Sequence, residues 1–537
     1  MPAVNLSPAG GVAAQFFTNS GNVLTGGKLY TYLAGTTTPA ATYTTSAGNV
    51  ARTNPIVLDA AGRVPSGGEI WLTQGVVYKF VLEDATSVLI ATYDNISGIS
   101  SLTLPIDSSN ITYDPPFAGS VATNVEDKLA QVVSVQDFGA VGNGSTNDTA
   151  AFQAALNSGF SVYIPPTGSS YIVSSTLTVP ANVAMYGDGY ESVIQYTGTG
   201  SAIVLDPGTG NATLYDSILA NFQLTNSNTA AVGIRLKDVA EVLIDSVYVI
   251  GLGGGFTTAA IEFSATAVTG AVFAVTMRDS ILRANQVGIK FSDQNLFNAI
   301  TIRGGRIQGN LGTAGIFADK TVKGFSIFGT VVEGNLNQNI LLNNGAEALT
   351  IQGCWFETNV AATNGIVLQG AGQYVGVNIS GNHFANNGAS PTGRALYMPG
   401  TNAIPYVGVN FNNNAIFGYG NTINPAVDFA SKRFDDSDFT NNFFGAGVTT
   451  PYGNLPAATS QGCVVKSRFG QAASVTDGST ISHNLGLTPT FVLATTTVAD
   501  EFVSVTAKSS TTFTVAIKKS DGTPGTSQTI YWRADVT

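Results

Sequence analysis

Charged residues are scarce in this chain: Asp, Glu, Lys and Arg make up 11% of its 537 residues, where an ordinary globular protein has about a quarter. The scarcity is not that of a membrane protein, because no apolar run approaches the length of about 20 residues that a spanning helix needs. The opening MPAVNLSPAG has neither the basic nor the apolar part of a signal peptide. We therefore expect no membrane insertion and no secretion signal.

Basic residues and cysteines are also few. The 23 Lys and Arg are outnumbered by 34 Asp and Glu, which gives a net charge of −11 and argues against a nucleic-acid partner. Cys354 and Cys463 lack the spacing of metal ligands and are expected to be structural thiols. Asp435, Asp436 and Asp438 lack the glycine and the distal glutamate of a calcium loop and are interpreted as a polar turn. The sequence thus predicts no metal and no cofactor.

Glycine (61 residues), Thr, Ser, Asn and Ala take the place of charge, a composition typical of strands and tight turns. Residues 1–105 alternate short apolar runs with Gly, Pro and Asn breaks, so we expect an N-terminal β domain. Residues 106–134 are turn-rich, with one short helical piece near 125–131, and predict a neck or linker. A second linker is expected at 456–470, before short strands at 471–537 that predict a small C-terminal β-sandwich.

The centre of the chain repeats itself. One apolar position, which we call the anchor, recurs at steps of 24 to 32 residues, and a second apolar side chain follows each anchor five residues later. A period near 25 with three short strands in each turn is the pattern of a β-solenoid, in which stacking closes the core. We therefore predict an all-β protein whose central domain, residues 135–455, is a parallel β-helix. The anchors are Met277, Ile302, Ile327, Ile351, Ile379, Phe411 and Phe439.

Asparagine follows the first five anchors at a fixed distance of eight residues. Asparagine tolerates left-handed turns, and identical amides stacked on successive coils hydrogen-bond along the stack. We therefore expect these residues to occupy one turn of the solenoid. They are Asn285, Asn310, Asn335, Asn359 and Asn387.

Two glutamates share one register of the repeat. If the anchor and the residue five later point inward, the residues one, four and six after the anchor point outward. Glu333 and Glu357 both lie six residues after an anchor, on neighbouring coils that are about 4.8 Å apart. Two adjacent carboxylates, one of them protonated, are what glycoside hydrolysis requires. We predict them as catalytic residues and leave open whether the reaction retains or inverts the anomeric configuration.

The outward positions around this pair carry side chains suited to sugars. Trp355 is placed to stack on a sugar ring, and Arg283, Arg303 and Arg306 to hold carboxylates or hydroxyls, with His383 beside them. These five residues are predicted to bind substrate. Two other interpretations stay open for the glutamates: they bond turn amides, or they face solvent. For the arginines, a lyase that acts on a uronic acid is an alternative.

Several motifs add a resemblance to a known class of protein. The run DFGAVGNGSTNDTAAFQAAL (137–156) resembles the N-terminal cap of pectin-lyase-like right-handed parallel β-helices. Its position after ITYDPP and VEDKLAQVVSV is similar to the neck junction of tailed-phage tailspikes. NLSPAGGVAAQFF to NPIVLDAAGRV (5–64) resembles the particle-binding domain of tailspikes from short-tailed phages. The end, ISHNLGLTPTFVLATTT to YWRADV, is similar to small β domains of phage fibres.

The resemblance implies a homotrimer made in the host cytoplasm and carried on the phage tail. Residues 1–105 would then bind the virion through tail or portal-proximal adaptor proteins. Residues 135–455 would bind, and as a depolymerase cleave, a bacterial surface polysaccharide such as capsule or O-antigen. Residues 471–537 would serve trimerisation or carbohydrate binding. An endo-glycosidase is the expected activity; the alternatives are a polysaccharide lyase and a receptor-binding fibre without enzymatic activity.

Overall fold

A computed structural model describes residues 2–11, 14–99, 107–208, 213–227, 229–252, 255–266, 270–293, 297–399, 404–421, 423–457, 460–483 and 485–536. The chain divides into two compact units, Met1–Val125 and Glu126–Thr537. The predicted limit between residues 105 and 106 lies outside the described residues.

The first unit is a β domain with two antiparallel sheets. One sheet has the order β1 (Val4–Leu6), β5 (Trp71–Thr73), β3 (Thr42–Tyr43). The other has the order β4 (Ile56–Val57), β2 (Lys28–Leu33), β6 (Tyr78–Glu83), β7 (Leu89–Ile96). Alternate side chains of β2 and β6 are buried, including Leu29 and Phe80. After this domain come the short pair β8 (Thr112–Tyr113) and β9 (Thr123–Asn124), followed by α1 (Val125–Leu129).

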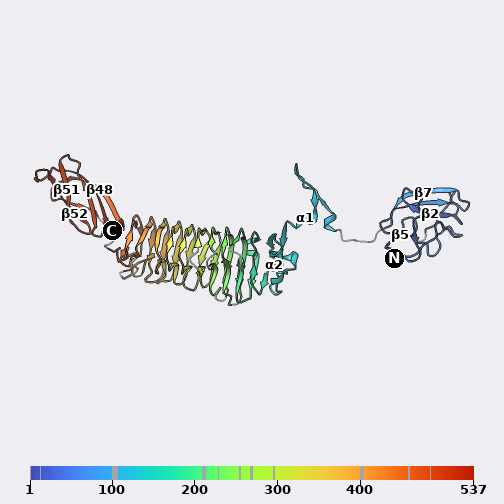
Figure 1. Ribbon diagram of the computed structural model, residues 1–537, viewed down its shortest axis with the longest axis horizontal. Coiled ribbons are helices and arrows are strands. Elements are labelled where there is room, and N and C mark those ends of the chain that lie inside the picture. The colour runs from blue at the N-terminus through green and yellow to red at the C-terminus, as the bar shows by residue number, and fades with distance from the viewer. Residues whose placement is uncertain are drawn as a thin grey trace. The chain divides into compact units, whose positions relative to one another are not determined.

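Helix α2 (Thr149–Leu156) lies at the beginning of the solenoid (Figure 1). It turns Phe152 and Leu156 into the core, where the Phe152 ring meets the edge of Tyr171. Asp148 precedes the helix but does not cap it, because its carboxylate accepts hydrogen bonds from the amides of Val141 and Gly142. The helix therefore covers the apolar end of the first coils, and Asp148 fastens the preceding loop.

The predicted right-handed parallel β-helix is confirmed: short strands stack in register from coil to coil (Figure 1). Among the described residues, one parallel sheet has 27 strands, and a second has 11. A middle coil runs through β27 (Phe297–Asn298), β28 (Thr301–Arg303), β29 (Arg306–Gln308) and β30 (Ile316–Ala318). Such a coil has four short strands where the sequence predicts three, because left-handed turns divide the large sheet.

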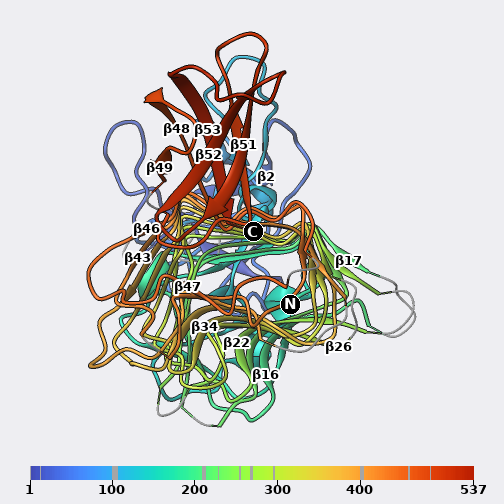
Figure 2. The same ribbon diagram turned by 90° about the vertical axis from the view of Figure 1, so that its left-hand side faces the viewer.

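The 11-stranded sheet forms one side of the stack, where Figure 2 shows β16, β22, β26 and β34 gathered. Each coil adds one strand to it by parallel pairing, as between Ile316 and Ile340. Its strands are β13 (Leu177–Thr178), β16 (Ser201–Leu205), β19 (Val232–Lys237), β22 (Ala259–Ala265), β26 (Ile289–Asp293), β30, β34 (Gln338–Leu342), β38 (Asn364–Leu368), β41 (Leu396–Tyr397), β44 (Val427–Asp428) and β47 (Tyr452–Gly453).

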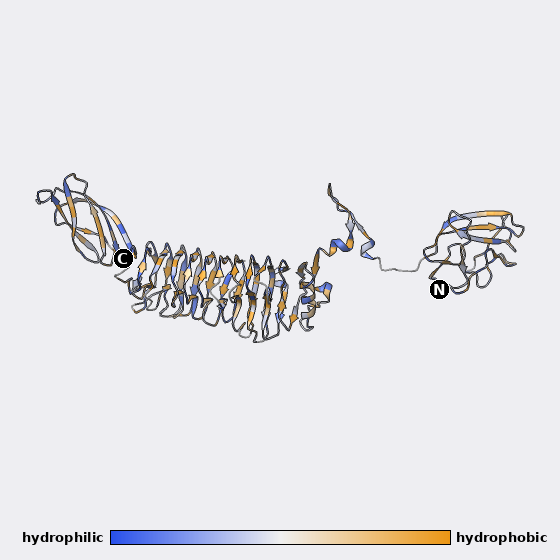
Figure 3. Cartoon of the chain, viewed as in Figure 1, coloured by the Kyte–Doolittle hydropathy of each residue, from blue (hydrophilic) through white to orange (hydrophobic). Residues whose placement is uncertain are grey.

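The anchors fill the interior of the coils, as predicted. Each anchor and the apolar residue five positions after it are buried, except the partly buried Phe444, and apolar stretches recur from coil to coil (Figure 3). Two residues after the anchor the backbone is left-handed, with φ +59° at Gly304 and +58° at Gly329. Glycine suits this position because it carries no Cβ to oppose a positive φ. The turn separates the strand of the anchor from the strand that carries the sixth residue.

The predicted asparagine turn is correct for three of its five members. Asn285, Asn310 and Asn335 are buried, and the Asn310 and Asn335 carboxamides each accept a hydrogen bond from the backbone amide of the preceding Asn. Their backbone is not left-handed; the left-handed residue comes one position earlier, as at Gly309 and Gly334. Asn359 and Asn387 are exposed.

The two exceptions have a common cause in the turn of their coils. Strands β37 (Trp355–Thr358) and β40 (His383–Asn386) continue one residue further and bury Thr358 and Asn386 instead. A second asparagine stack, which the sequence analysis missed, lies three residues after the anchors at the buried Asn382 and Asn414 and the partly buried Asn442. Amide stacks therefore line two corners of the solenoid.

The second unit ends in a β-sandwich. One sheet has the order β48 (Lys466–Val475), β53 (Gln528–Val536), β50 (Phe491–Thr495), and the other β49 (Thr480–Ser482), β52 (Thr512–Lys519), β51 (Glu501–Lys508). The sandwich packs on the last coil, since Ala534 and Val536 belong to the solenoid core. The Val465 amide also bonds the Val536 carbonyl at 2.6 Å. Within the described chain, no helix is long and apolar enough to cross a bilayer.

Candidate functional site

Two glutamates stand side by side on the outside of the large sheet. Strand β33 (Val331–Glu333) pairs with β37, and this register places Glu333 opposite Glu357. Val332 and Phe356, the residues just before them, are fully buried, so alternation along the strand turns both glutamates outward. The repeat thus predicts this juxtaposition correctly. We call the outward column that contains them the glutamate column.

Glu333 has a cation close to its carboxylate. The Nε atom of Arg306, one coil earlier, lies 3.7 Å from Oε1 of Glu333, which is beyond hydrogen-bond distance. The Arg306 side chain is 49% exposed and that of Glu333 is 22% exposed. Such a pair attracts without fixing either group, and Arg306 is accessible to a ligand that lies over the column.

Glu357 is held more firmly. Trp355 Nε1 donates to Glu357 Oε2 at 2.9 Å, and Asn387 Nδ2 donates to Glu357 Oε1 at 2.8 Å. A donor on each oxygen orients the carboxylate and stabilises its negative charge. Asn387 is a site residue that the sequence analysis placed in the stacked asparagine turn. The extended β40 turns it outward, a change that the Asn pattern alone does not reveal.

An aromatic run continues from Glu357 along the following coils. The Trp355 and His383 rings stack at 3.9 Å and 10°, His383 lies 5.1 Å from Phe417, and Phe417 lies 5.7 Å from Phe443. Burial lowers the pKa of His383, and the Glu357 charge acts in the opposite direction. Trp355 remains 42% exposed, so part of this run is open to a sugar ring.

The other two predicted arginines lie farther from Glu357. Arg283 is exposed in the glutamate column, where Gln308 separates it from Glu333. Arg303 lies across the turn at Gly304, in β28, with its guanidinium 5.4 Å from the Phe328 ring. The structure therefore gathers Arg306, Trp355 and His383 around the glutamates, places Arg283 along the same column and places Arg303 on the adjacent strand. The described residues include no group of three or more His, Cys, Asp or Glu arranged to hold a metal ion.

The outward row thus combines carboxylates with arginine and aromatic side chains, which can hydrogen-bond to and stack on a sugar. Residues 132–419 match the family described as Rhamnogalacturonase A/epimerase, pectate lyase-like. The chain belongs to this family.

Curated relatives bear out the predicted resemblance to phage tailspikes. The chain is 44% identical over 70 residues to the tail spike protein of an Escherichia phage, covering 13% of this chain and 8% of that protein. It is 32% identical over 136 residues to the tail spike protein of Shigella phage Sf6, covering 24% and 21%. The match thus spans at most about a fifth of these relatives.

Among solved structures, the A-module of the Azotobacter vinelandii mannuronan C-5 epimerase AlgE4 is similar. It is 17% identical with a TM-score of 0.41, over 61% of this chain and 99% of that one.

Proposed function

We propose that this chain is a subunit of a phage tailspike that binds a bacterial surface polysaccharide and hydrolyses it at Glu333 and Glu357. The observation that carries the proposal is the register of the two glutamates, which are neighbours on adjacent coils beside Arg306 and Trp355. Glycoside hydrolysis uses one carboxyl group as acid and another as base or nucleophile. The similarity to tail spike proteins of phages supports the assignment to a tailspike.

The two carboxylates differ in a way that suggests their roles. Glu357 accepts a hydrogen bond on each oxygen, which fixes its carboxylate, and we assign it as the base or nucleophile. We assign Glu333, whose carboxylate has Arg306 Nε 3.7 Å away and beyond hydrogen-bond distance, as the acid that protonates the leaving oxygen. Trp355 then has two functions: its indole N–H orients Glu357, and its ring faces the sugar.

The test is shortening of purified capsular and O-antigen polysaccharides, followed by size-exclusion chromatography. We expect Glu333→Gln and Glu357→Gln each to slow cleavage by about 10²–10⁴-fold while the melting temperature stays unchanged. Glu347→Gln is the matched control, since Glu347 is an exposed carboxylate of the same sheet outside the glutamate column. Normal cleavage by both variants would remove the proposed site. If the wild-type protein shortens none of the glycans, the hydrolase is contradicted and a receptor-binding fibre without enzymatic activity is favoured.

A lyase is the second candidate. His383 has a pKa lowered by burial, so it is neutral near pH 7 and available as a base, and Arg306 is placed to neutralise a uronate. Ultraviolet absorbance from an unsaturated uronic product, with cleavage retained in Glu333→Gln, would favour this chemistry over hydrolysis.

Assembly is a further part of the proposal. The segment between the N-terminal β domain and the solenoid exposes Phe117 (73%), Val121 (83%) and Leu129 (69%). These side chains are available for contact with other chains, and we assign this segment to the neck of a homotrimer whose residues 1–105 bind the virion. Light scattering should give three chain masses; a stable monomer would contradict the trimer.

A further inference from the structure

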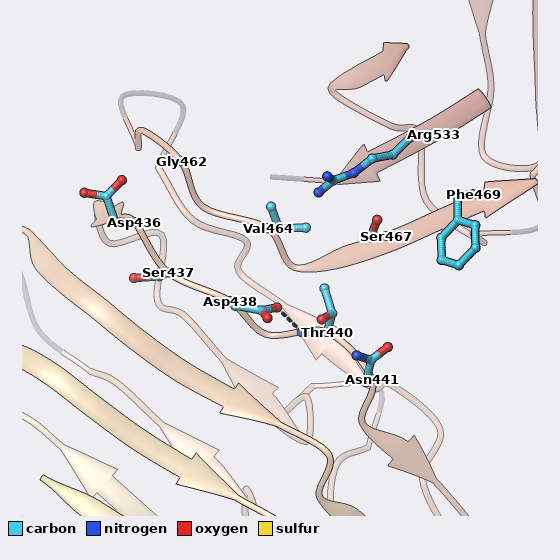
Figure 4. Close-up of a pocket in the computed structure, with 10 residues that line it drawn as sticks. All are labelled: Asp436, Ser437, Asp438, Thr440, Asn441, Gly462, Val464, Ser467, Phe469 and Arg533. Atoms are coloured by element: carbon cyan, nitrogen blue, oxygen red, sulfur yellow. Dashed lines mark hydrogen bonds between the residues drawn. The ribbon is translucent and has the colours of Figure 1, made fainter. Parts of the chain in front are cut away.

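A cavity of about 560 Å³ lies where the last coil of the solenoid meets the C-terminal sandwich, and Figure 4 shows the residues that line it. The last coil contributes Asp436, Asp438 and Asn441, and the C-terminal sandwich contributes Ser467, Phe469 and Arg533. In Figure 4 side chains from these two parts face the same space. The volume is within the range of ordinary small-ligand sites. We call this cavity the distal pocket.

The walls of the distal pocket are fixed by hydrogen bonds. Asp535, which is 5% exposed, accepts hydrogen bonds from Ser467 Oγ at 2.6 Å and Arg533 Nε at 3.0 Å. On the opposite wall, Asp438 Oδ1 accepts from the Thr440 amide at 2.8 Å. The segment that connects the two walls pairs with the last coil, because the Val464 amide donates a hydrogen bond to the Ser437 carbonyl at 2.8 Å. Ser467, Arg533 and Asp438 are therefore oriented before any ligand arrives.

The lining has the chemistry of a sugar site. Phe469 is 85% exposed at the edge of the cavity and offers an aromatic face to the apolar side of a pyranose ring. The Asp436 and Asp438 carboxylates accept hydrogen bonds from hydroxyl groups, and the Arg533 guanidinium donates them. Arg533 is already paired with Asp535. The charges of Asp436 and Asp438 are therefore not balanced by Arg533, and the pocket is negatively charged. An acidic sugar would be repelled, and an uncharged one would not.

The aromatic run of the candidate site leads toward this end of the solenoid. From Trp355 it passes His383 and Phe417 to Phe443, three coils on, about 14 Å along the stack. Phe443 is 60% exposed and belongs to the last coil, two residues after Asn441. A glycan chain that lies over Glu357 and follows the aromatic side chains would thus approach the distal pocket.

We propose that the distal pocket binds an uncharged pyranose unit of the polysaccharide whose cleavage site is at Glu333 and Glu357. The identity of the glycan rests on the proposed function; binding in the pocket does not. Long chains would span both places, and short fragments would reach only one. The pocket would therefore lower the KM for polymer and leave the kcat for short fragments unchanged.

The experiment measures binding separately from cleavage. The full-length Glu333→Gln, Glu357→Gln double variant is run in native gels that contain graded amounts of purified neutral or uronic-acid-containing surface polysaccharides. Retardation in the gel gives the dissociation constant. We expect a neutral glycan to retard the protein and Phe469→Ala to weaken that binding about five-fold. Phe502→Ala is the matched control, because Phe502 is 64% exposed on the other sheet of the same sandwich.

Three results would overturn the inference: no retardation by any polysaccharide, equal weakening by Phe469→Ala and Phe502→Ala, or tighter binding after Asp438→Asn. The last substitution keeps an oxygen for the Thr440 amide and removes only the charge, so tighter binding would point to an acidic ligand. Retardation that depends on Phe469 in a protein whose wild type cleaves no glycan would support the pocket and contradict the proposed hydrolase. Cleavage that requires Glu333, together with binding that Phe469→Ala does not change, would support the proposed hydrolase and contradict the pocket.

Discussion

Two carboxylates on the 11-stranded sheet, Glu262 and Asp428, differ in burial and pairing from Glu333 on the large sheet. On the 11-stranded sheet, Glu262 and Asp428 have side chains only 5% and 2% exposed. Glu262 meets Arg235 at 2.7 Å and accepts from Ser292, while Asp428 meets Arg394 at 2.7 Å. On the large sheet, Glu333 is partly exposed and its arginine is 3.7 Å away. Glu262 and Asp428 therefore complete the stack, whereas Glu333 remains accessible.

The comparison distinguishes carboxylates that are buried and paired within the stack from carboxylates that a ligand can reach. A buried carboxylate requires a partner because desolvation of an unpaired charge is costly. Glu262 and Asp428 have such partners within the stack and offer little to a ligand. Glu333 and Glu357 lie over a fully buried row of apolar residues, so the fold does not need them for packing. The proposed site uses these two accessible carboxylates, which share one register of the large sheet.

Breaking a structural pair should give the largest effect on stability. Asp428→Asn keeps the side-chain shape but leaves the mostly buried Arg394 guanidinium without its counter-charge, at a cost of about 3 kcal/mol. The expected result is a lower melting temperature by calorimetry, with normal glycan cleavage below the transition. Glu347→Gln breaks the Lys323 pair, in which both side chains are nearly half exposed, and should cost at most about 1 kcal/mol. Equal melting temperatures of Asp428→Asn and Glu347→Gln would contradict the difference between the buried and the exposed ion pair.

A somewhat smaller loss is expected in the inner corner of the stack. Asn310 is buried, donates to Asn335 Oδ1 at 2.9 Å and accepts from the Asn285 amide at 3.1 Å. Asn310→Ala leaves the buried Asn285 amide without its acceptor and removes one of the two donors to Asn335 Oδ1, so it should destabilise the protein by about 2 kcal/mol. Asn359→Ala, at the same distance from its anchor but exposed, should stay within about 0.5 kcal/mol of wild type. Denaturant midpoints of the two variants compare them directly, and a midpoint for Asn359→Ala as low as that for Asn310→Ala would contradict this assignment.

Asn359 and Asn310 also show how far the sequence could predict the structure. Inward apolar residues are required in every coil, so the anchors gave the solenoid, its register and the meeting of Glu333 with Glu357. The turns were harder to predict, because a strand that extends by one residue buries Thr358 and turns the next asparagine outward. The contact of Asn387 with Glu357 and the buried pairs of the other face depend on such local geometry. The distal pocket depends on packing between residues about 100 positions apart, as Asp436 and Arg533 are, and no periodic pattern records that.

The smallest predicted effect is on the pH dependence of stability, and it comes from His383, a partly buried side chain beside the accessible Glu357. Burial lowers its pKa in the folded state below the value of about 6.5 expected in the unfolded chain. Between the two pKa values the unfolded chain binds more protons, so this residue makes the protein more stable as pH rises through that window and less stable as pH falls. His383→Phe keeps a ring against Trp355 and removes the titration, so its melting temperature should fall less than that of wild type between pH 7.5 and 5. Because the Glu357 charge opposes the shift, Glu357→Gln should make the acid loss larger than in wild type. If His383→Phe and Glu357→Gln change the acid loss in the same direction, His383 does not titrate as a partly buried neighbour of that carboxylate.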